Sequence, residues 1–117
     1  MTKSISDNFL ACAGGLGILA TGPLNAKTTG EAIDEIRRMT DKPFAIGATL
    51  LMPGASENVE VAIEKKVPVV NFSLGKGDEI VRRVHAYGGK VIATVVSEKH
   101  ARSAIASGVD ALMVTGM

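Results

Sequence analysis

Five short apolar runs recur along this chain, and their starts lie 28, 25, 22 and 20 residues apart. The runs cover residues 16–20, 44–51, 69–72, 91–96 and 111–114. Short continuous apolar runs are typical of strands that are buried on both faces, as in a parallel sheet. A glycine or proline within a short polar stretch precedes each of the last four runs, which is how helices end. The repeat therefore predicts five parallel strands.

The segments between the runs have helical periodicity. In the first segment, Thr28 and Glu31 have the spacing of a capping box. The four apolar stripes are formed by Ala32, Ile33, Ile36 and Met39; by Val59, Ala62 and Ile63; by Ile80, Val81 and Val84; and by Ala101, Ala104 and Ile105. Strands that alternate with helices of this length indicate right-handed βαβ units.

Two architectures fit this order of elements, an open flavodoxin-like sheet and a part of a (β/α)8 barrel. An open nucleotide-binding fold usually has its glycine-rich phosphate loop after the first strand. Here Gly14, Gly15 and Gly17 come before or at the start of the first run, so the match of Gly15-x-Gly17-x-x-Ala20 to a dinucleotide fingerprint has the wrong context. A whole barrel needs ~250 residues. We therefore expect an α/β fold, a partial (β/α)8 barrel of about four to five parallel βα units, as one domain over residues 1–117.

Composition excludes several classes of protein. The 13 basic and 12 acidic residues give a net charge of +1 and form no basic stripe, so a nucleic-acid partner is not expected. No apolar run approaches the ~20 residues of a membrane helix. Residues 1–10 contain no apolar core of signal-peptide length, and the single cysteine, Cys12, cannot form an internal disulfide. These features predict a cytoplasmic protein. The sequence contains no HExxH or CxxC pattern, so we expect no metal site.

Five segments that cover nearly the whole chain carry a family resemblance. They are Ala-Gly-Gly-Leu-Gly-Ile-Leu-Ala at 13–20, Thr-Asp-Lys-Pro-Phe at 40–44, Val-Pro-Val-Val at 67–70, Lys-Val-Ile at 90–92 and Gly-Val-Asp-Ala-Leu-Met-Val-Thr-Gly-Met at 108–117. In this order the chain resembles the nitronate monooxygenase (2-nitropropane dioxygenase-like) family, which includes the FMN-dependent enoyl-acyl-carrier-protein reductase. The resemblance implies an FMN-binding (β/α)8 barrel, of which the chain corresponds to about strands two to five and looks truncated.

The resemblance implies that Gly47 and Thr94 lie near the flavin ring, where family members often have asparagine in place of Gly47 and some have lysine in place of Thr94. A bulge at Gly47 and simple packing of Thr94 are the alternatives. Asn71 and Ser73 come at the end of the third run, where ligands collect in parallel α/β folds, although a loop cap is the simpler account. The expected cofactor-binding residues are Gly47, Asn71, Ser73 and Thr94, with no catalytic residue assigned.

Three other features have ordinary interpretations. Asp78 is expected to cap the helix that follows it, although the Gly75–Gly77 stretch could also hold an anion with its backbone N–H groups. His85 and His100 fall within helical segments, so both are expected at the surface rather than at a strand tip.

The function that the resemblance implies is FMN-dependent oxidation of a small nitronate. The alternatives are reduction of an enoyl thioester and a non-catalytic, self-associating βα scaffold. The family's catalytic histidine and FMN phosphate loops are expected outside these residues, so the isolated chain is expected to be inactive. Its unpaired sheet edges predict a homo-oligomer or a partner that completes the barrel.

Overall fold

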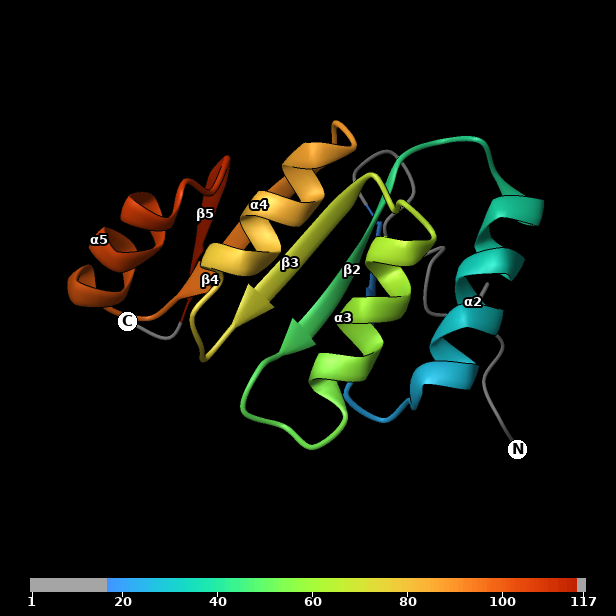
Figure 1. The fold of residues 1–117 in the computed structure, drawn as a ribbon. Helices are drawn as coiled ribbons and strands as arrows, with labels where there is room; N and C mark the ends of the chain where they lie inside the picture. Colours follow the sequence, from blue (N-terminus) through green and yellow to red (C-terminus); the bar gives the residue numbers. More distant parts are fainter. Residues whose placement is uncertain (1–16, 116–117) are drawn as a thin grey trace.

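The computed structural model describes residues 17–115, and over this range five strands alternate with four α-helices (Figure 1). The elements are β1 (Gly17–Ala20), α2 (Ala26–Met39), β2 (Phe44–Thr49), α3 (Ala55–Glu64), β3 (Val69–Ser73), α4 (Asp78–Ala86), β4 (Lys90–Val95), α5 (Glu98–Ser107) and β5 (Ala111–Val114). The expectations for residues 1–10, Cys12, Gly14 and Gly15 lie outside the described residues.

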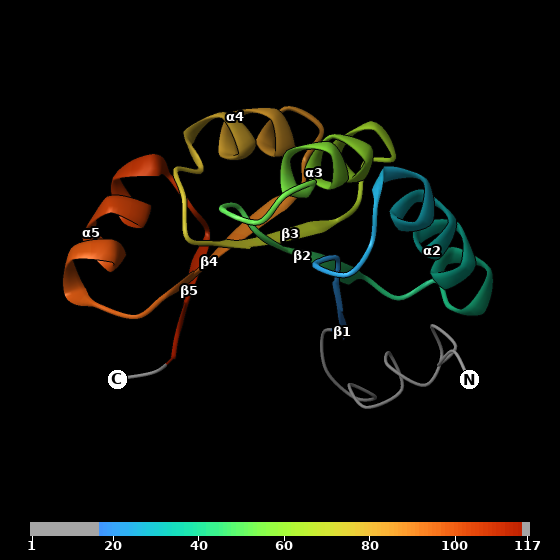
Figure 2. The same ribbon diagram turned by 90° about the horizontal axis from the view of Figure 1, so that it is seen from below.

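The sheet has the order β1-β2-β3-β4-β5, and every neighbouring pair is parallel. A strand order that follows the sequence is that of a (β/α)8 barrel, whereas an open doubly wound sheet reverses its order at a switch point. The described helices all lie on one face of the curved sheet, as the view in Figure 2 shows. The predicted partial barrel is confirmed, and the open flavodoxin-like alternative is wrong. The helix-free face is the one that lines the interior of such a barrel.

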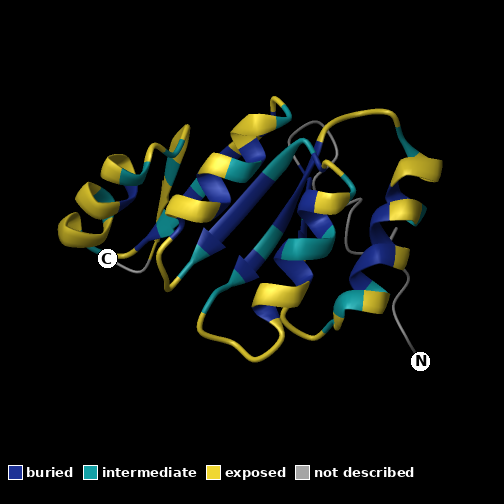
Figure 3. Ribbon diagram, viewed as in Figure 1, coloured by how far each residue is buried: buried dark blue, intermediate teal, exposed yellow. Residues whose placement is uncertain are grey.

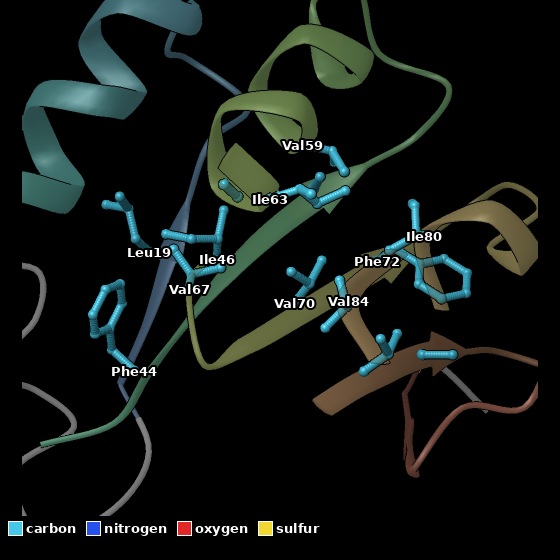
Figure 4. Packing of buried hydrophobic residues seen from close by; sticks show 14 of the residues in the cluster. Leu19, Phe44, Ile46, Val59, Ile63, Val67, Val70, Phe72, Ile80 and Val84 are labelled. Atoms are coloured by element: carbon cyan, nitrogen blue, oxygen red, sulfur yellow. The ribbon is translucent and has the colours of Figure 1, made fainter. Parts of the chain in front are cut away.

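The core lies between the sheet and its helices. Along the central strands, alternate side chains point toward the helices. These strands are among the most buried parts of the chain (Figure 3). Ile46 and Val70 from the strands, and Ile33, Ile36 and Val84 from the helices, are completely buried. Figure 4 shows that buried side chains from the strands, such as Ile46 and Val70, form one cluster with side chains from the helices, such as Ile63 and Val84. Burying each such side chain stabilises the fold by ~1.5–3 kcal/mol.

The predicted cap of the first helix is wrong. The cap of α2 is Asn25, whose Oδ1 accepts a hydrogen bond of 2.9 Å from the backbone N–H of Thr28. In return, the Thr28 hydroxyl oxygen accepts a hydrogen bond of 2.9 Å from the backbone N–H of Asn25. The capping box therefore joins Asn25 and Thr28 rather than Thr28 and Glu31. Asparagine is among the best N-cap residues, and a threonine hydroxyl here replaces the usual glutamate.

Asp78 is also not a cap, because it is the first residue within α4 and Gly77 is the N-cap. The reason is steric, since a Cβ atom on Gly77 would lie 2.2 Å from the ring atom Cζ of Phe72. Only glycine fits where the chain passes this ring. Asp78 instead places its carboxylate in the first helical turn, where it interacts favourably with the helix dipole.

The outer helix α5 packs more loosely than its sequence predicts. Ala104 is buried, but Ile105, which the apolar stripe places in the core, is 61% exposed. The second strand is also shorter than its apolar run, since β2 ends at Thr49 and Leu51 lies in the following loop.

Candidate functional site

The four residues expected near the flavin lie on the helix-free face of the sheet or at the carboxyl ends of its strands. Val70 and Phe72 point into the core, so Asn71 between them faces the opposite way. The same alternation places Gly47 and Thr94 on that face. Gly47 is the direct register partner of Asn71, and Thr49 is the partner of Ser73. The structure therefore brings together residues from three consecutive strands, β2, β3 and β4.

Asn71 and Thr94 are joined by their side chains. The Nδ2 atom of Asn71 lies 3.0 Å from the hydroxyl oxygen of Thr94, and the Oδ1 atom lies 3.1 Å from the same oxygen. The Asn71 side chain is largely buried, at 9% exposure. A carboxamide has two N–H donors and two carbonyl lone pairs, so one hydroxyl leaves hydrogen-bonding capacity unused. That spare capacity is available to a ligand on this face.

Gly47 lies beside Asn71 on this face and has no side chain. Its register with both neighbouring strands is continuous, so the alternative of a bulge at Gly47 is wrong. Its carbonyl oxygen accepts hydrogen bonds from the backbone N–H (3.0 Å) and the hydroxyl (2.9 Å) of Thr21. A Cβ atom at this position would lie 3.1 Å from Cγ2 of Ile18, which is a tight contact. The absence of a side chain at this position therefore avoids a tight contact with Ile18.

Ser73 closes the end of β3. Its hydroxyl lies 3.4 Å from the hydroxyl of Thr49, and its carbonyl oxygen accepts a hydrogen bond of 2.8 Å from the backbone N–H of Leu50. These contacts fit the simpler account of Ser73 as a residue that ties the strand end to its neighbour.

A pocket of about 270 Å³ opens beside this group, between the ends of β3 and β4 and the inner side of α5. Ser73 and Thr94 line the pocket, whereas Gly47 and Asn71 do not. Lys76 and His100 also line it, and neither was expected there from the sequence. A glycine-flanked lysine ahead of a helix was the only signal that pointed to Lys76. His100 is exposed, as expected, but it lies at a pocket.

The other histidine lies at the opposite end of the sheet. The Nε2 atom of His85 is 2.8 Å from Oδ2 of Asp110, which also accepts a hydrogen bond of 2.7 Å from the backbone N–H of Val91. Partial burial would raise the pKa of Asp110, but the hydrogen bonds from His85 and Val91 outweigh it and lower that pKa. The pair holds the start of β5 against β4 and is far from the ligand end of the strands.

The part of the chain that the structure describes offers neither a metal-binding cluster nor a helix that could cross a membrane. Within residues 17–115, no group of three or more histidine, cysteine, aspartate or glutamate side chains is placed to hold a metal ion. None of the helices in this range is both long and apolar enough to cross a membrane.

Comparison with known proteins gives matches to parts of several oxidoreductases, although no family model matches the chain. It is 36% identical over 106 residues to the (3aS,4S,5R,7aS)-5-hydroxy-7a-methyl-1-oxo-octahydro-1H-indene-4-carboxyl-CoA dehydrogenase of Mycobacterium tuberculosis, covering 91% of this chain and 30% of that protein. It is 24% identical over 144 residues to a nitronate monooxygenase of Paraburkholderia phytofirmans, covering 90% of this chain and 39% of that protein.

Among solved structures, FabK from Thermotoga maritima superimposes with a TM-score of 0.84 at 38% identity. The match covers 97% of this chain and 36% of FabK. The chain thus spans roughly a third of the length of the proteins that it matches. The resemblance proposed from the sequence is confirmed: the chain is related to the nitronate monooxygenase and FabK group of oxidoreductases and corresponds to one part of their barrel.

Proposed function

We propose that this chain forms the flavin-facing part of the barrel in an FMN-dependent oxidoreductase of the nitronate monooxygenase type. The observation that carries the proposal is the side-by-side arrangement of Gly47, Asn71 and Thr94 on the helix-free face. This face is directed toward the interior of a barrel, near the carboxyl ends of the strands, where ligands of this fold bind.

The residues present fit a flavin ring. A planar isoalloxazine needs hydrogen-bonding groups at its edge and room for its ring, and Gly47, which has no side chain, lies beside Asn71 on the face proposed to receive it. Asn71 has unused donor and acceptor capacity, and the Thr94 hydroxyl holds its carboxamide in place. When bound, FMN would supply the electron transfer, while these residues bind and orient it. Family members often have asparagine in place of Gly47, and some have lysine in place of Thr94. Gly47 and Thr94 would make fewer side-chain contacts with the flavin, so we predict weak binding.

The exposed apolar side chains at the carboxyl ends of the strands help to indicate the class of substrate. Leu51 is 75% exposed, Met52 and Leu74 are each 50% exposed, and Val96 is 43% exposed. All four lie in loops that follow strand ends. A small nitronate is the substrate that the family name suggests, but this apolar rim fits a larger acyl group. An acyl thioester substrate is therefore the second candidate, and the acyl-CoA relative favours it.

Binding of lumiflavin, which has the isoalloxazine ring but no phosphate, tests the proposal. Titration of the chain should quench lumiflavin fluorescence with a saturable, weak affinity, with a Kd on the order of 1 mM, which corresponds to about −4 kcal/mol. Replacing Asn71 by leucine should abolish the quenching. Ser56→Ala, on the exposed surface of α3, is the matched control and should leave it unchanged. Absence of saturable quenching by the folded chain would favour the non-catalytic scaffold.

We also propose that the chain associates through its sheet edge, either with a second copy or with a barrel-completing partner. Within the described residues β5 pairs only with β4, and its Val114 and Met113 are 59% and 38% exposed. An unpaired parallel strand with apolar side chains readily accepts another strand.

A further inference from the structure

Asn58 is a polar residue on the buried face of α3. Its side chain is 2% exposed, and it shares this face with the apolar residues Val59, Ala62 and Ile63. Such a position ordinarily takes an apolar side chain, because burying a carboxamide costs free energy unless its polar atoms are hydrogen-bonded. The hydrogen bonds that Asn58 makes therefore decide what it contributes.

The carboxamide of Asn58 reaches the turn between β1 and α2. Its Nδ2 atom donates to the carbonyl oxygen of Thr21 at 3.1 Å and to that of Leu24 at 2.9 Å. The backbone N–H of Leu24 also donates to the carbonyl oxygen of Thr21, at 2.9 Å, and this bond closes the turn. A carboxamide has two N–H donors, and both are used here. Asn58 thus holds both ends of a turn that lies 34 and 37 residues before it in the chain.

The same turn holds the strand at Gly47. The backbone N–H and the hydroxyl of Thr21 both donate to the carbonyl oxygen of Gly47, at 3.0 Å and 2.9 Å. Thr21 is 1% exposed, so these bonds are shielded from water. Because glycine has no side chain to pack, its backbone bonds alone hold it in place. Asn58, Thr21 and Gly47 therefore form one chain of hydrogen bonds from α3 to the helix-free face.

The second polar atom of Asn58 adds nothing to stability. Its Oδ1 atom is buried and has no hydrogen-bond partner among the described residues. Turning the carboxamide over would not relieve this, because the two carbonyl oxygens would then lose their donor. A buried acceptor without a partner is destabilising, and a leucine of similar size would avoid that cost. Stability alone therefore does not explain an asparagine at this position.

We propose that Asn58 is a positioning residue, which acts through Thr21 to fix the backbone of Gly47 on the face that receives the flavin. This role rests on the proposed flavin-binding function. The carboxamide of Asn58 locks the turn, and the turn presents the two donors of Thr21 to Gly47. A Cβ atom on Gly47 would lie 4.0 Å from Oδ1 of Asn71, so a shift of this backbone changes the space beside the Asn71 carboxamide.

Amide hydrogen exchange of the isotope-labelled chain tests the positioning without any ligand. Asn58→Leu should speed exchange at the backbone amides of Thr21 and Leu24 by about tenfold, because the turn loses a local constraint. The amides of β4 should exchange as in the wild type. Ser56→Leu, which places the same side chain on an exposed position of α3, is the matched control and should leave the turn unchanged.

Lumiflavin quenching tests the effect on the flavin face. Asn58→Leu and Thr21→Val should each weaken binding by about three- to tenfold, the effect of one hydrogen bond. Thr21→Ser keeps the hydroxyl and should bind as the wild type does. The double variant of Asn58→Leu and Thr21→Val should bind no more weakly than the weaker single variant, because both residues act through one chain of hydrogen bonds.

Wild-type affinity in a folded Asn58→Leu chain would overturn the inference, and so would losses that add in the double variant. Faster exchange throughout the Asn58→Leu chain, rather than at the turn, would show a merely structural role and would also overturn it. Absence of quenching by the wild-type chain would instead count against the flavin proposal. The exchange measurement then still decides whether Asn58 holds the turn.

Discussion

The carboxamide of Asn71 on β3 lies within hydrogen-bonding distance of the Thr94 hydroxyl on β4, at 3.0 Å and 3.1 Å from its two polar atoms. The two residues are not register partners, because Asn71 pairs with Ile92. Their contact is diagonal, and it reaches from inside the paired register of the two strands to the residue just beyond its last pair, Phe72 and Ala93. It therefore joins Asn71, the register partner of Gly47, to Thr94, which also lines the pocket beside α5.

Removing the Thr94 hydroxyl tests the strength of this contact. Thr94→Val keeps the shape of the side chain but leaves the largely buried Asn71 carboxamide without its partner, so the free energy of unfolding should fall by about 1–3 kcal/mol. Thr94→Ser retains the hydroxyl and should cost less than about 1 kcal/mol. Urea denaturation of the three proteins measures both values. Equal losses in the two variants would show that the methyl group, rather than the hydrogen bond, matters at this position.

Gly77→Ala should destabilise the fold by about 1–3 kcal/mol, because the added methyl group overlaps the ring of Phe72. Its backbone φ angle of −108° is open to any residue, so the loss would be purely steric. Gly22→Ala is the control, since nothing lies within 4 Å of a Cβ atom there. Thermal or urea unfolding of both variants measures the difference. A Gly77→Ala protein as stable as Gly22→Ala would show that the Phe72 ring does not pack as described.

The sequence predicted the repeating architecture well but the contacts between elements poorly. Strand and helix positions follow from local periodicity, which needs no knowledge of neighbouring elements. The cap of α2 was missed because Asn25 and Thr28 form a capping box of an unusual type. Ile105 was placed in the core because a helical stripe indicates which residues share a face, but not how closely that face packs.

The predictions for the site divide in the same way, because positions along a strand could be predicted but contacts between elements could not. Asn71 and Ser73 could be placed at a strand end from the sequence, because strand ends follow from the repeat. Gly47 and Thr94 were expected near the flavin only from the family resemblance. The diagonal contact between Asn71 and Thr94 depends on the register of β3 and β4, which the sequence does not reveal. Lys76 and His100 come together at one pocket only because α5 stands beside the end of β3, and no local pattern encodes that arrangement.

Asp110 should make stability depend on pH in the acid range. Its pKa in the folded state is lowered below the ordinary value of 3.8, so its contribution is fully present above that value. The contribution is lost as the pH falls through the folded-state pKa. Asp110→Asn should therefore be less stable than the wild type at neutral pH, and the difference should disappear in acid. Urea denaturation over this pH range measures it, with Asp41→Asn in an exposed loop as the control. A difference that persists unchanged in acid would contradict the assignment.

The proposed association through β5 predicts a concentration-dependent mass in sedimentation experiments. Val114→Lys should shift the chain toward the monomer, because a charged side chain on an edge strand opposes strand addition. Ile105→Lys places the same charge on an exposed position of α5 and should leave association unchanged. A chain that is monomeric at every concentration, with its fold intact, would rule out self-association and leave a barrel-completing partner to be sought.

The most direct test of the flavin assignment is to map lumiflavin binding on the labelled chain by backbone amide shifts. The account predicts that the shifts concentrate at Gly47, Asn71, Thr94 and their neighbours on the helix-free face, and that they are lost in Asn71→Leu. Residues of the outer helix surface, such as Ile105, should not respond. Shifts on the helix side alone, or a map unchanged by Asn71→Leu, would contradict the claim that this face receives the flavin.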